Sequence, residues 1–331
     1  MLILSINKNN LKGDVEIMFK KAQPLFIYTE TSTRVGSGSD LGYVDLPIQR
    51  ERHSGFPKFE ASSLKGSLRS VFESDDKLKD MVKYTFGPED GDLYAGGLGF
   101  MDSRILLFPI KSVKGIFAWV TCPYILSRFR EEMLLCNEYE AEALNDIESI
   151  EPNSVTQNTE LKLKARDGRG AVILEEYQFQ VKEDKVLTQF SKWLANALFP
   201  NVDAYGVFRE KMQKDIMVIS DDAFRDFTEL STEVITRTRI DPDKGVVKQG
   251  HLFNEEYVPE NTVFYSLALA SSLFGMSNGE KSKLSVGGKS DEDIILEYFF
   301  DGIERHDIIQ IGGNATIGKG IVRIGAMKGV N

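Results

Sequence analysis

The stretch from Gly42 to Pro57 reads Gly-Tyr-Val-Asp-Leu-Pro-Ile-Gln-Arg-Glu-Arg-His-Ser-Gly-Phe-Pro and is the most informative segment of the chain. Charged side chains crowd it, and two prolines punctuate it. Between Arg50 and Arg69 there are five Lys or Arg residues against two Glu residues, in a chain whose net charge is −10. A basic stretch in an acidic chain indicates a local phosphate-binding surface. A solvated surface loop is the alternative that the residues alone leave open.

Composition limits the class of protein. The chain has 331 residues, of which 42% are hydrophobic, enough for a core in one or two domains. Two cysteines, Cys122 and Cys136, are too few for a disulfide framework. The amino-terminal residues show no leader pattern, and the longest apolar stretches, 116–126 and 263–274, are shorter than a bilayer span. We therefore expect a cytoplasmic protein that has no membrane partner.

Hydrophobic periodicity predicts strands and helices in mixed order. Residues 14–28 alternate apolar and polar positions, as a half-buried strand does. Ser62 and Ser63 precede an apolar i, i+4, i+7 face, which predicts a helix with a serine cap. A turn rich in Pro, Asp and Gly separates the strand-like runs 231–240 and 246–253 and predicts a long hairpin. Because the helices do not alternate one for one with the strands, we expect an α+β fold with an antiparallel sheet.

The domain organisation follows from a change of composition in the middle of the chain. Residues 137–195 are dominated by Glu, Asp, Asn and Lys, and we interpret them as an inserted helical or irregular module that faces solvent in part. The whole chain, 1–331, is otherwise interpreted as a single domain, from which the hairpin at 231–257 extends.

Two common sequence motifs of functional sites do not match this chain. Residues 313–320 nearly fit the phosphate loop of nucleotide hydrolases, but Gly320 lacks the hydroxyl that binds magnesium, and a strand-like run follows it. His53, His251 and His306 lie far apart and form no zinc-binding pair. Glycines beside a lysine can still approach a phosphate backbone through bare amides, although a tight turn between strands is equally consistent.

Taken together, these strings resemble the RAMP superfamily of CRISPR proteins and, more narrowly, the repeated backbone subunits of type III-B (Cmr) effector complexes. The segment 42–57 is the most specific match, and the glycine-rich segment 311–320 is shared across the superfamily. The resemblance covers most of the chain, with 137–195 covered weakly. Further matching strings are Gly36-Ser-Gly38, Ser62-Ser-Leu-Lys-Gly-Ser-Leu-Arg69, Phe86-Gly87, Phe100-Met-Asp-Ser-Arg104, Leu107-Phe-Pro109, Phe117-Ala-Trp-Val-Thr121, Leu230-Ser-Thr-Glu-Val-Ile-Thr-Arg237 and Leu252-Phe-Asn-Glu-Glu-Tyr257.

The resemblance implies a fold, partners and an activity. The fold is a ferredoxin-like (RRM-related) core with large insertions and a β-hairpin thumb, which we assign to the hairpin at 231–257. The partners are a CRISPR guide RNA, a complementary target RNA, copies of the chain itself in a filament, and other subunits of the Cmr complex. The activity is cleavage of the target RNA at regular intervals, as an endoribonuclease within the assembled complex.

For catalysis, the resemblance points to Asp45. Two roles stay open: general base for the attacking 2′-hydroxyl, or ligand of a divalent metal, Mg²⁺ or Mn²⁺, that assembles only with target RNA. Metal binding is the role that we favour, because the family's cleavage depends on metal. Glu255 and Tyr257, at the end of the hairpin, are supporting catalytic candidates. A turn or a helix cap is the alternative interpretation of Asp45.

For RNA binding, we predict contacts to phosphates that ignore base identity, as a carrier of many guides requires. The family usually carries a histidine at the position of Arg34, so the role of that histidine does not transfer, because arginine cannot act as a base at neutral pH. The predicted RNA-binding residues are Arg34, Arg50, Arg52, His53, Ser62, Ser63, Lys65, Arg69, Arg237, Arg239, Gly312, Gly313, Gly318 and Lys319.

Two other functions remain open at this point. One is a structural, non-catalytic guide-binding subunit of the effector filament, as occurs for relatives in DNA-targeting complexes. The other is a stand-alone guide-processing ribonuclease, which the match to the backbone group disfavours.

Overall fold

The computed structural model describes residues 18–39, 42–89, 94–136, 142–164, 170–200, 202–240, 243, 245–277, 279, 281 and 288–326. Within these residues, one 11-stranded sheet has the order β10-β6-β11-β5-β4-β14-β1-β16-β15, with β2 paired to β4 and β3 paired to β14. Its strands are β1 (Lys21–Thr29), β2 (Lys58–Phe59), β3 (Leu98–Phe100), β4 (Ser103–Lys111), β5 (Phe117–Thr121), β6 (Ser154–Thr156), β10 (Lys182–Asp184), β11 (Ile216–Val218), β14 (Val263–Ala270), β15 (Ile308–Gln310) and β16 (Ile321–Ala326).

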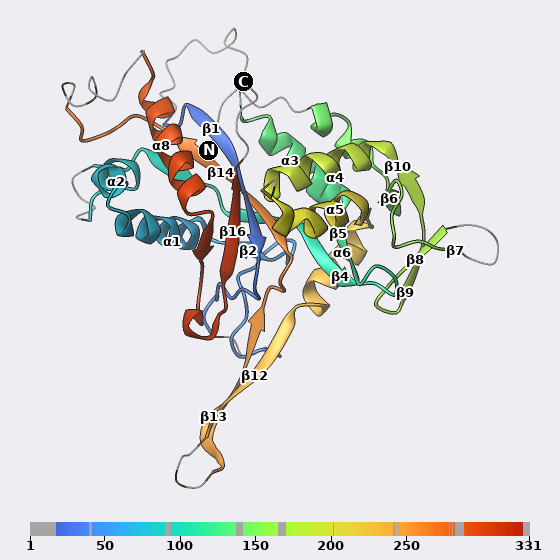
Figure 1. The fold of residues 1–331 in the computed structure, drawn as a ribbon. Helices are drawn as coiled ribbons and strands as arrows, with labels where there is room; N and C mark the ends of the chain where they lie inside the picture. Colours follow the sequence, from blue (N-terminus) through green and yellow to red (C-terminus); the bar gives the residue numbers. More distant parts are fainter. Residues whose placement is uncertain are drawn as a thin grey trace.

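Helices cover this sheet from two sides in Figure 1, with α1, α2 and α8 on one side and α3, α4 and α5 on the other. Their starts follow local chemistry, since Asp184, Ser220 and Ser290 accept backbone N–H bonds as caps of α4, α6 and α8. The helices are α1 (Ala61–Ser74), α2 (Lys79–Thr85), α3 (Pro123–Met133), α4 (Lys185–Leu198), α5 (Gly206–Lys214), α6 (Asp221–Leu230) and α8 (Asp291–Arg305), with short 3-10 turns at Glu142–Leu144, Ile147–Ser149, Asp203–Tyr205 and Ala315–Ile317.

The mixed α+β class is confirmed, but the sheet, which we expected to be antiparallel, also contains parallel pairs. β5 pairs with β11 in parallel, and so does β6 with β10. A parallel pair needs a long crossover, and the chain between β5 and β11 supplies one that includes α3, α4 and α5. The remaining pairs of this sheet run antiparallel within the described residues.

The core lies where central strands meet helices on both sides. All eight residues of β14 are buried, as a strand covered on two faces requires. α8 packs on β14 and β1, and α4 packs on β1 and β16. Rings of Phe26, Phe129 and Trp193 contact one another between β1, α3 and α4. Within the described residues, no helix combines the length and the apolar composition needed to cross a membrane.

The segment 137–195, interpreted from the sequence as an inserted module, is joined to this core. Its described residues place β6 and β10 at one edge of the large sheet and form a small sheet β7-β8-β9 (Leu163–Lys164, Gly170–Leu174, Tyr177–Gln180). α4 runs past the predicted boundary at 195 and buries eight side chains. The helical spacing of the apolar residues in α4 therefore determines its burial in the core, although the composition of the surrounding segment is polar.

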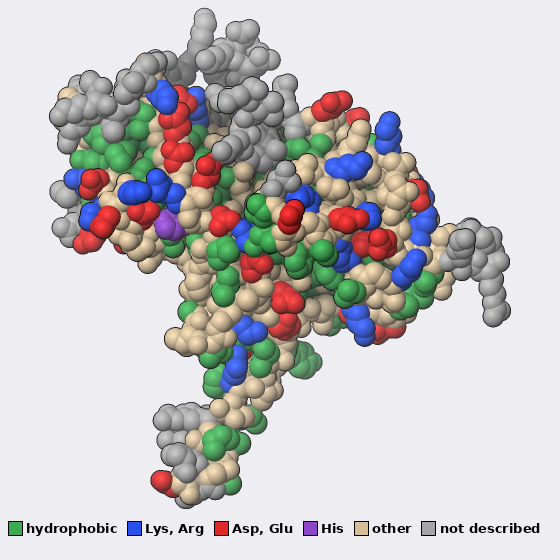
Figure 2. All heavy atoms as spheres, in the orientation of Figure 1, with side chains coloured by type: hydrophobic (Ala, Val, Ile, Leu, Met, Phe, Trp, Pro, Cys, Tyr) green, Lys and Arg blue, Asp and Glu red, His purple; other side chains and the backbone are tan. Residues whose placement is uncertain are grey.

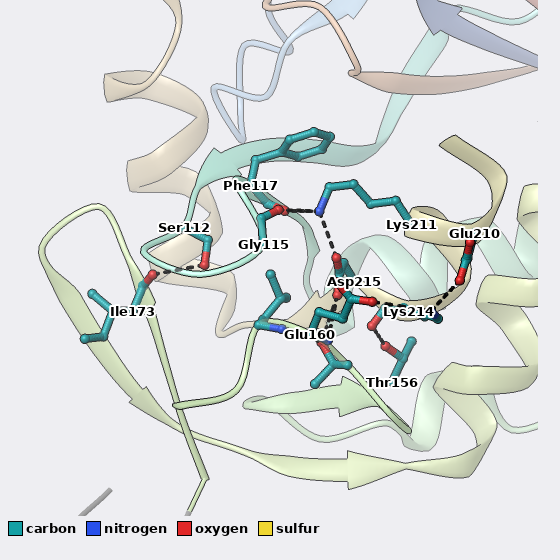
Figure 3. A network of polar contacts seen from close by, with 12 residues as sticks. Ser112, Gly115, Phe117, Thr156, Glu160, Ile173, Glu210, Lys211, Lys214 and Asp215 are labelled. Carbon is teal, nitrogen blue, oxygen red and sulfur yellow. Dashed lines mark hydrogen bonds and ion pairs between the residues drawn. The ribbon is translucent and has the colours of Figure 1, made fainter. Parts of the chain in front are cut away.

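A polar network fixes the far edge of the sheet (Figure 3). The Lys211 ammonium donates to the carbonyls of Gly115 and Phe117, each at 2.7 Å, and to Asp215 Oδ2 at 2.8 Å. Asp215 Oδ1 accepts from the Thr159 hydroxyl and from the Glu160 amide, each at 3.1 Å. The network ties the loop before β5 and the segment after β6 to the end of α5.

A two-stranded hairpin projects away from the globular part (Figure 1). β12 (Glu233–Ile240) pairs antiparallel with β13 (Val247–Tyr257), in a register that sets Ile235 opposite Glu255 and contains an irregularity between Thr238 and Ile240. The base of the hairpin joins the body of the protein at β14 and α6. Part of the predicted turn, including Asp241 and Pro242, lies outside the described residues.

Candidate functional site

The base of the hairpin holds a buried carboxylate, Glu255, surrounded by donors. It accepts from Arg237 Nε at 3.0 Å, from the Tyr257 hydroxyl at 2.6 Å, and from Asn314 Nδ2 at 3.1 and 3.2 Å. Asn314 also donates to the Tyr257 hydroxyl at 2.6 Å. Since side chains of a strand alternate between faces, Glu255 and Tyr257 share one face of β13 and Glu256 occupies the other. We call Arg237, Glu255, Tyr257 and Asn314 the hairpin-base cluster.

The cluster keeps Glu255 ionised and Tyr257 protonated. Burial favours the neutral form of Glu255, but the hydrogen bonds from Tyr257, Asn314 and Arg237, with the charge of Arg34, outweigh it and hold the carboxyl pKa below its usual value. Burial and the neighbouring Glu255 charge raise the pKa of the Tyr257 phenol. At neutral pH the pair therefore consists of an anion and a neutral hydroxyl donor.

The glycine-rich loop between β15 and β16 packs against this cluster. Lys319 Nζ lies 5.1 Å from the centre of the Tyr257 ring, a cation–π distance. The Gly313 amide donates to the Arg34 carbonyl at 3.0 Å, which joins the loop to the segment after β1. Gly312 has φ +81°, and a Cβ there would lie 2.1 Å from the Arg34 carbonyl oxygen, so only glycine permits this approach.

Asp45 lies beside the hairpin, next to Asn254, which is the residue before Glu255 in β13. The Leu46 amide donates to the Asn254 carbonyl at 3.0 Å, and the Glu256 amide donates to the Leu46 carbonyl at 3.1 Å, which adds this segment to β13 as a short parallel bridge. The Asn254 amide donates to Asp45 Oδ2 at 2.8 Å. Asp45 itself is exposed. The three predicted catalytic residues thus gather at one end of the hairpin, although 209 residues separate Asp45 from Asn254 in the chain.

Among the basic residues predicted in 50–53, the structure separates Arg50 from its neighbours. The Arg50 guanidinium donates to the carbonyls of Gly55 and Thr228 and to Glu256, so its partners are internal. The RNA-binding role assigned to Arg50 stays a prediction, and it would require Arg50 to exchange these partners. Arg52 and His53 are exposed, and the RNA-binding role assigned to them stays a prediction.

The start of α1 differs from the serine-capped helix that the sequence predicts. The helix begins at Ala61 with Glu60 at the cap position, and Ser62 and Ser63 lie inside the first turn. The Ala61 amide donates to Asp102 Oδ1 at 2.9 Å, so a carboxylate of the chain already occupies part of this helix end. The predicted serine cap is wrong, because the strand pair β2–β4 brings Asp102 to that place.

Lys65 and Arg69 both make intramolecular bonds. Lys65 Nζ donates to the Leu98 carbonyl at 2.9 Å, and burial, with the charge of Arg69, lowers the pKa of its ammonium group. Arg69 donates to Glu73 and to the Gly87 carbonyl. Their contacts to RNA stay predictions, and to make them Lys65 and Arg69 would have to release their present hydrogen-bond partners.

Two of the glycine amides also make intramolecular bonds. The Gly313 amide donates to the Arg34 carbonyl, and the Gly318 amide donates to the Ala315 carbonyl. The RNA-binding role assigned to these two amides stays a prediction, and it would require them to exchange partners. Lys319 lies over the Tyr257 ring, and Gly312 lies against the Arg34 carbonyl; the RNA-binding roles assigned to both stay predictions. Arg237 belongs to the hairpin-base cluster, whereas the side chain of Arg239 lies outside the described part of the chain.

The carboxylates fit a metal ion that is held mainly by other ligands. Among the described residues, no group of three or more His, Cys, Asp or Glu side chains is arranged to hold a metal ion. Glu255 is occupied by three donors, which leaves Asp45 as a single exposed carboxylate with one oxygen bonded to Asn254. Mg²⁺ commonly takes one or two carboxylates together with water and phosphate oxygens. The residues present are compatible with that arrangement.

Two residues of the site were missed by sequence reasoning. Asn314 lay inside the glycine-rich string that was interpreted through its backbone, yet its side-chain amide bonds both Glu255 and Tyr257. Glu256 lay beside a catalytic candidate, and its acceptor role depends on a segment more than two hundred residues away. A signal for Asn314 existed, since asparagine tolerates the left-handed conformation that it adopts here, φ 65°.

Comparison with known proteins gives one consistent answer. The RAMP superfamily model matches residues 26–323. The CRISPR system Cmr endoribonuclease Cmr4 of Pyrococcus furiosus is 37% identical over 312 residues, 92% of this chain and 95% of that protein. The crystal structure of oligomeric Cmr4 from Pyrococcus furiosus superimposes with a TM-score of 0.68 at 30% identity, covering 94% of this chain and 99% of that one. The cryo-EM structure of the apo state of Type III-B Cmr-beta gives 0.69 at 25% identity, covering 94% and 99%. The chain therefore belongs to the RAMP superfamily and, within it, to the Cmr4 family.

Proposed function

We propose that this chain is a repeated backbone subunit of a type III-B CRISPR ribonucleoprotein, which binds guide RNA and cleaves complementary target RNA. The observation that carries the proposal is the position of Asp45, an exposed carboxylate held by the Asn254 amide beside the hairpin-base cluster. The 37% identity to an endoribonuclease of the same family supports the activity.

A ferredoxin-like core is the finer fold that we infer. Taken in chain order, β1, β4, β14 and β16 are four strands, and the sheet runs through them as fourth, first, third, second with antiparallel neighbours. α1 lies between the first two strands in the chain, and α8 lies between the last two. This βαββαβ order is that of a ferredoxin-like unit, with β5, β6, β10 and β11 as an extension of its sheet.

The hairpin is proposed as the thumb that enters the guide–target duplex. Its described surface carries exposed apolar side chains, including Val234, Ile240, Val246 and Leu252, and Figure 2 shows hydrophobic side chains along its projecting part. Apolar wedges separate stacked bases when they enter a duplex. A displaced nucleotide beside the hairpin would then lie next to Asp45.

Cleavage would use the hydroxyl that RNA itself provides. The 2′-oxygen attacks the adjacent phosphorus, the bond from phosphorus to the 5′-oxygen breaks, and the leaving oxygen takes a proton. Geometry with the two oxygens in line lowers the barrier without a protein nucleophile. The protein must therefore position the nucleotide, assist removal of the 2′ proton, and stabilise charge on the phosphate.

We assign these tasks to the residues at the end of the hairpin. Asp45 would hold Mg²⁺ or Mn²⁺ together with water and phosphate oxygens, and the ion would supply neutralisation of phosphate charge. Glu255 keeps Arg237 and Tyr257 in fixed orientations through direct bonds. Lys319, held over the Tyr257 ring, brings a positive charge to the same place.

The partners proposed are guide RNA, target RNA, further copies of this chain and other Cmr subunits. The relatives support this set, because one was crystallised as oligomeric Cmr4 and another is part of Type III-B Cmr-beta. Contacts of the guide would be made from Arg34, Arg52, His53, Ser62, Ser63, Lys65, Arg69 and Lys319.

Cleavage of a guide-complementary RNA by the reconstituted complex tests the proposal. We expect evenly spaced products with the wild-type chain, and a loss of about 10³-fold or more with Asp45→Ala, because a charged catalytic group is removed. Chelation of divalent metal should abolish the same products. Guide and target binding should persist in Asp45→Ala. Target binding without any cut by the wild-type complex would instead make this chain a scaffold.

A further inference from the structure

Glu256 lies on the face of β13 opposite the hairpin-base cluster and is 5% exposed. Its carboxylate accepts three hydrogen bonds, from the Ile48 amide at 3.1 Å, from Arg50 Nη2 at 2.5 Å, and from the Thr232 hydroxyl at 2.8 Å. Two of these donors belong to the segment that follows Asp45. None of the three is needed to hold the hairpin strands together, since β12 and β13 pair through their own backbones.

Backbone pairing between the Asp45 segment and β13 ends early. Leu46 makes both backbone bonds to β13, through Asn254 and Glu256. The next amide that faces β13, that of Ile48, meets the Glu256 side chain instead of a backbone carbonyl. On the other side, the Gln49 amide bonds to Val35. The Glu256 carboxylate thus continues the attachment of the segment to β13 where the ladder stops.

Charge makes this attachment specific. The Arg50 guanidinium is the counter-charge of Glu256, and it also donates to the carbonyls of Gly55 and Thr228. Thr228 belongs to α6, so Arg50 ties the segment to the helix that leads into the hairpin. A carboxylate at 256 is the acceptor for one amide, one guanidinium and one hydroxyl, and a neutral amide cannot accept from all three in the same way.

We propose that Glu256 is a positioning residue, which sets Asp45 by fixing the Leu46–Arg50 segment against β13. This inference rests on the proposed function, because it assumes that Asp45 acts in cleavage. Among the described residues, Asp45 makes one hydrogen bond to β13, from the Asn254 amide. The orientation of the Asp45 carboxylate toward bound RNA therefore depends on how firmly residues 46–50 are attached to β13. Displacement of a catalytic group by 1 Å can cost about 10²-fold in rate.

The test measures single-turnover cleavage in the reconstituted complex, with saturating target RNA, for Glu256→Gln. We expect a rate about tenfold below wild type, with guide occupancy and target Kd unchanged. The matched control is Glu51→Gln. Glu51 is also buried and also pairs with an arginine, Arg128, but it anchors the turn after Arg50 to α3 instead of to β13. The control should lose stability similarly and keep the wild-type cleavage rate per assembled complex.

A second readout distinguishes positioning of Asp45 from a general structural effect. In the Asp45→Asn background, Glu256→Gln should not lower the residual cleavage further, because the group through which it acts has gone. If Glu256→Gln prevents folding, Thr232→Val removes a single hydrogen bond to the same carboxylate and should lower the rate by about two- to threefold.

Three outcomes would overturn the inference. A wild-type rate in Glu256→Gln and in Thr232→Val would show that the segment needs no such anchor, while leaving the role of Asp45 intact. Equal losses of rate in Glu256→Gln and Glu51→Gln would reduce Glu256 to a structural residue. Full cleavage in Asp45→Asn, or none by the wild-type complex, would overturn the proposed function itself and this inference with it.

Discussion

Two buried carboxylates, Asp215 and Glu255, have similar surroundings and different relations to the rest of the molecule. Asp215 is 3% exposed and Glu255 is 6% exposed. Each accepts from a cationic side chain and from a hydroxyl, Lys211 and Thr159 in one case, Arg237 and Tyr257 in the other. By burial and pairing alone, the two would be equal candidates for a functional site.

The two carboxylates differ in the other contacts that their partners make. The Lys211 ammonium makes its two other hydrogen bonds to backbone carbonyls, so the Asp215 network connects backbone segments to one another (Figure 3). The partners of Glu255 are side chains from β12, β13 and the glycine-rich loop, beside an exposed carboxylate and a lysine. Side chains can exchange partners when RNA arrives, whereas a network closed by backbone carbonyls resists change. A buried charge whose hydrogen bonds are all made within the protein therefore indicates a structural role, unless other charged side chains lie beside it.

The largest expected effect breaks the Asp215 network. Asp215→Asn leaves the partly buried Lys211 ammonium without its counter-charge, and we expect a loss of about 3 kcal/mol in the free energy of unfolding. Denaturation by urea, followed by circular dichroism, measures it. Cleavage per assembled complex should not change. A matched control is Glu210→Gln, which breaks the exposed pair with Lys214 on the same helix and should change stability little.

That prediction would fail if Asp215→Asn unfolded at the wild-type urea concentration. It would also fail if the variant assembled normally and lost cleavage. In the second case the far edge of the sheet would be part of the active site, and the contrast between the two carboxylates would be lost.

A change at Glu255 should affect activity more than stability. Glu255→Gln places an amide group among the donors of Arg237, Tyr257 and Asn314, so the cluster can no longer hold its present arrangement. We expect single-turnover cleavage to fall by about 10²-fold, with target binding retained. Glu233→Gln is the control on the same hairpin, because the Glu233 side chain accepts from the Ser32 hydroxyl and, within the described part of the chain, has no hydrogen bond or ion pair to the cluster. Comparable losses in both variants would mean that the hairpin, and not the cluster, is sensitive.

Sequence reasoning identified the two ends of this site but not their connection. Asp45, Glu255 and Tyr257 were named through family strings, and local patterns predicted β1, α1 and the hairpin. The contacts that join them depend on which residue of β13 faces Leu46, and a register between distant segments leaves no local pattern. Asn314 and Glu256 were missed for that reason.

The internal partners of the predicted RNA-binding groups could not be predicted for the same reason. The sequence around Arg50 and Gly313 does not show which groups their guanidinium and amide bind. In the fold, their partners come from α6, from β13 and from the segment after β1. Local chemistry identifies groups that need a partner, and only tertiary structure decides whether that partner is the protein or RNA.

The smallest expected effect is a pH dependence that separates Glu255 from an ordinary surface carboxylate. Its pKa in the folded protein is held below the usual value, so its contribution to stability is fully present above the usual glutamate pKa of about 4.5. The contribution is lost only as the pH falls through the lowered pKa. The difference in unfolding free energy between wild type and Glu255→Gln should thus stay constant from pH 7 to about pH 5 and shrink on further acidification. Urea titrations at a series of pH values measure that difference. A difference that grew on acidification would require a raised pKa, and with it a protonated Glu255 unable to hold Arg237 as an ion pair.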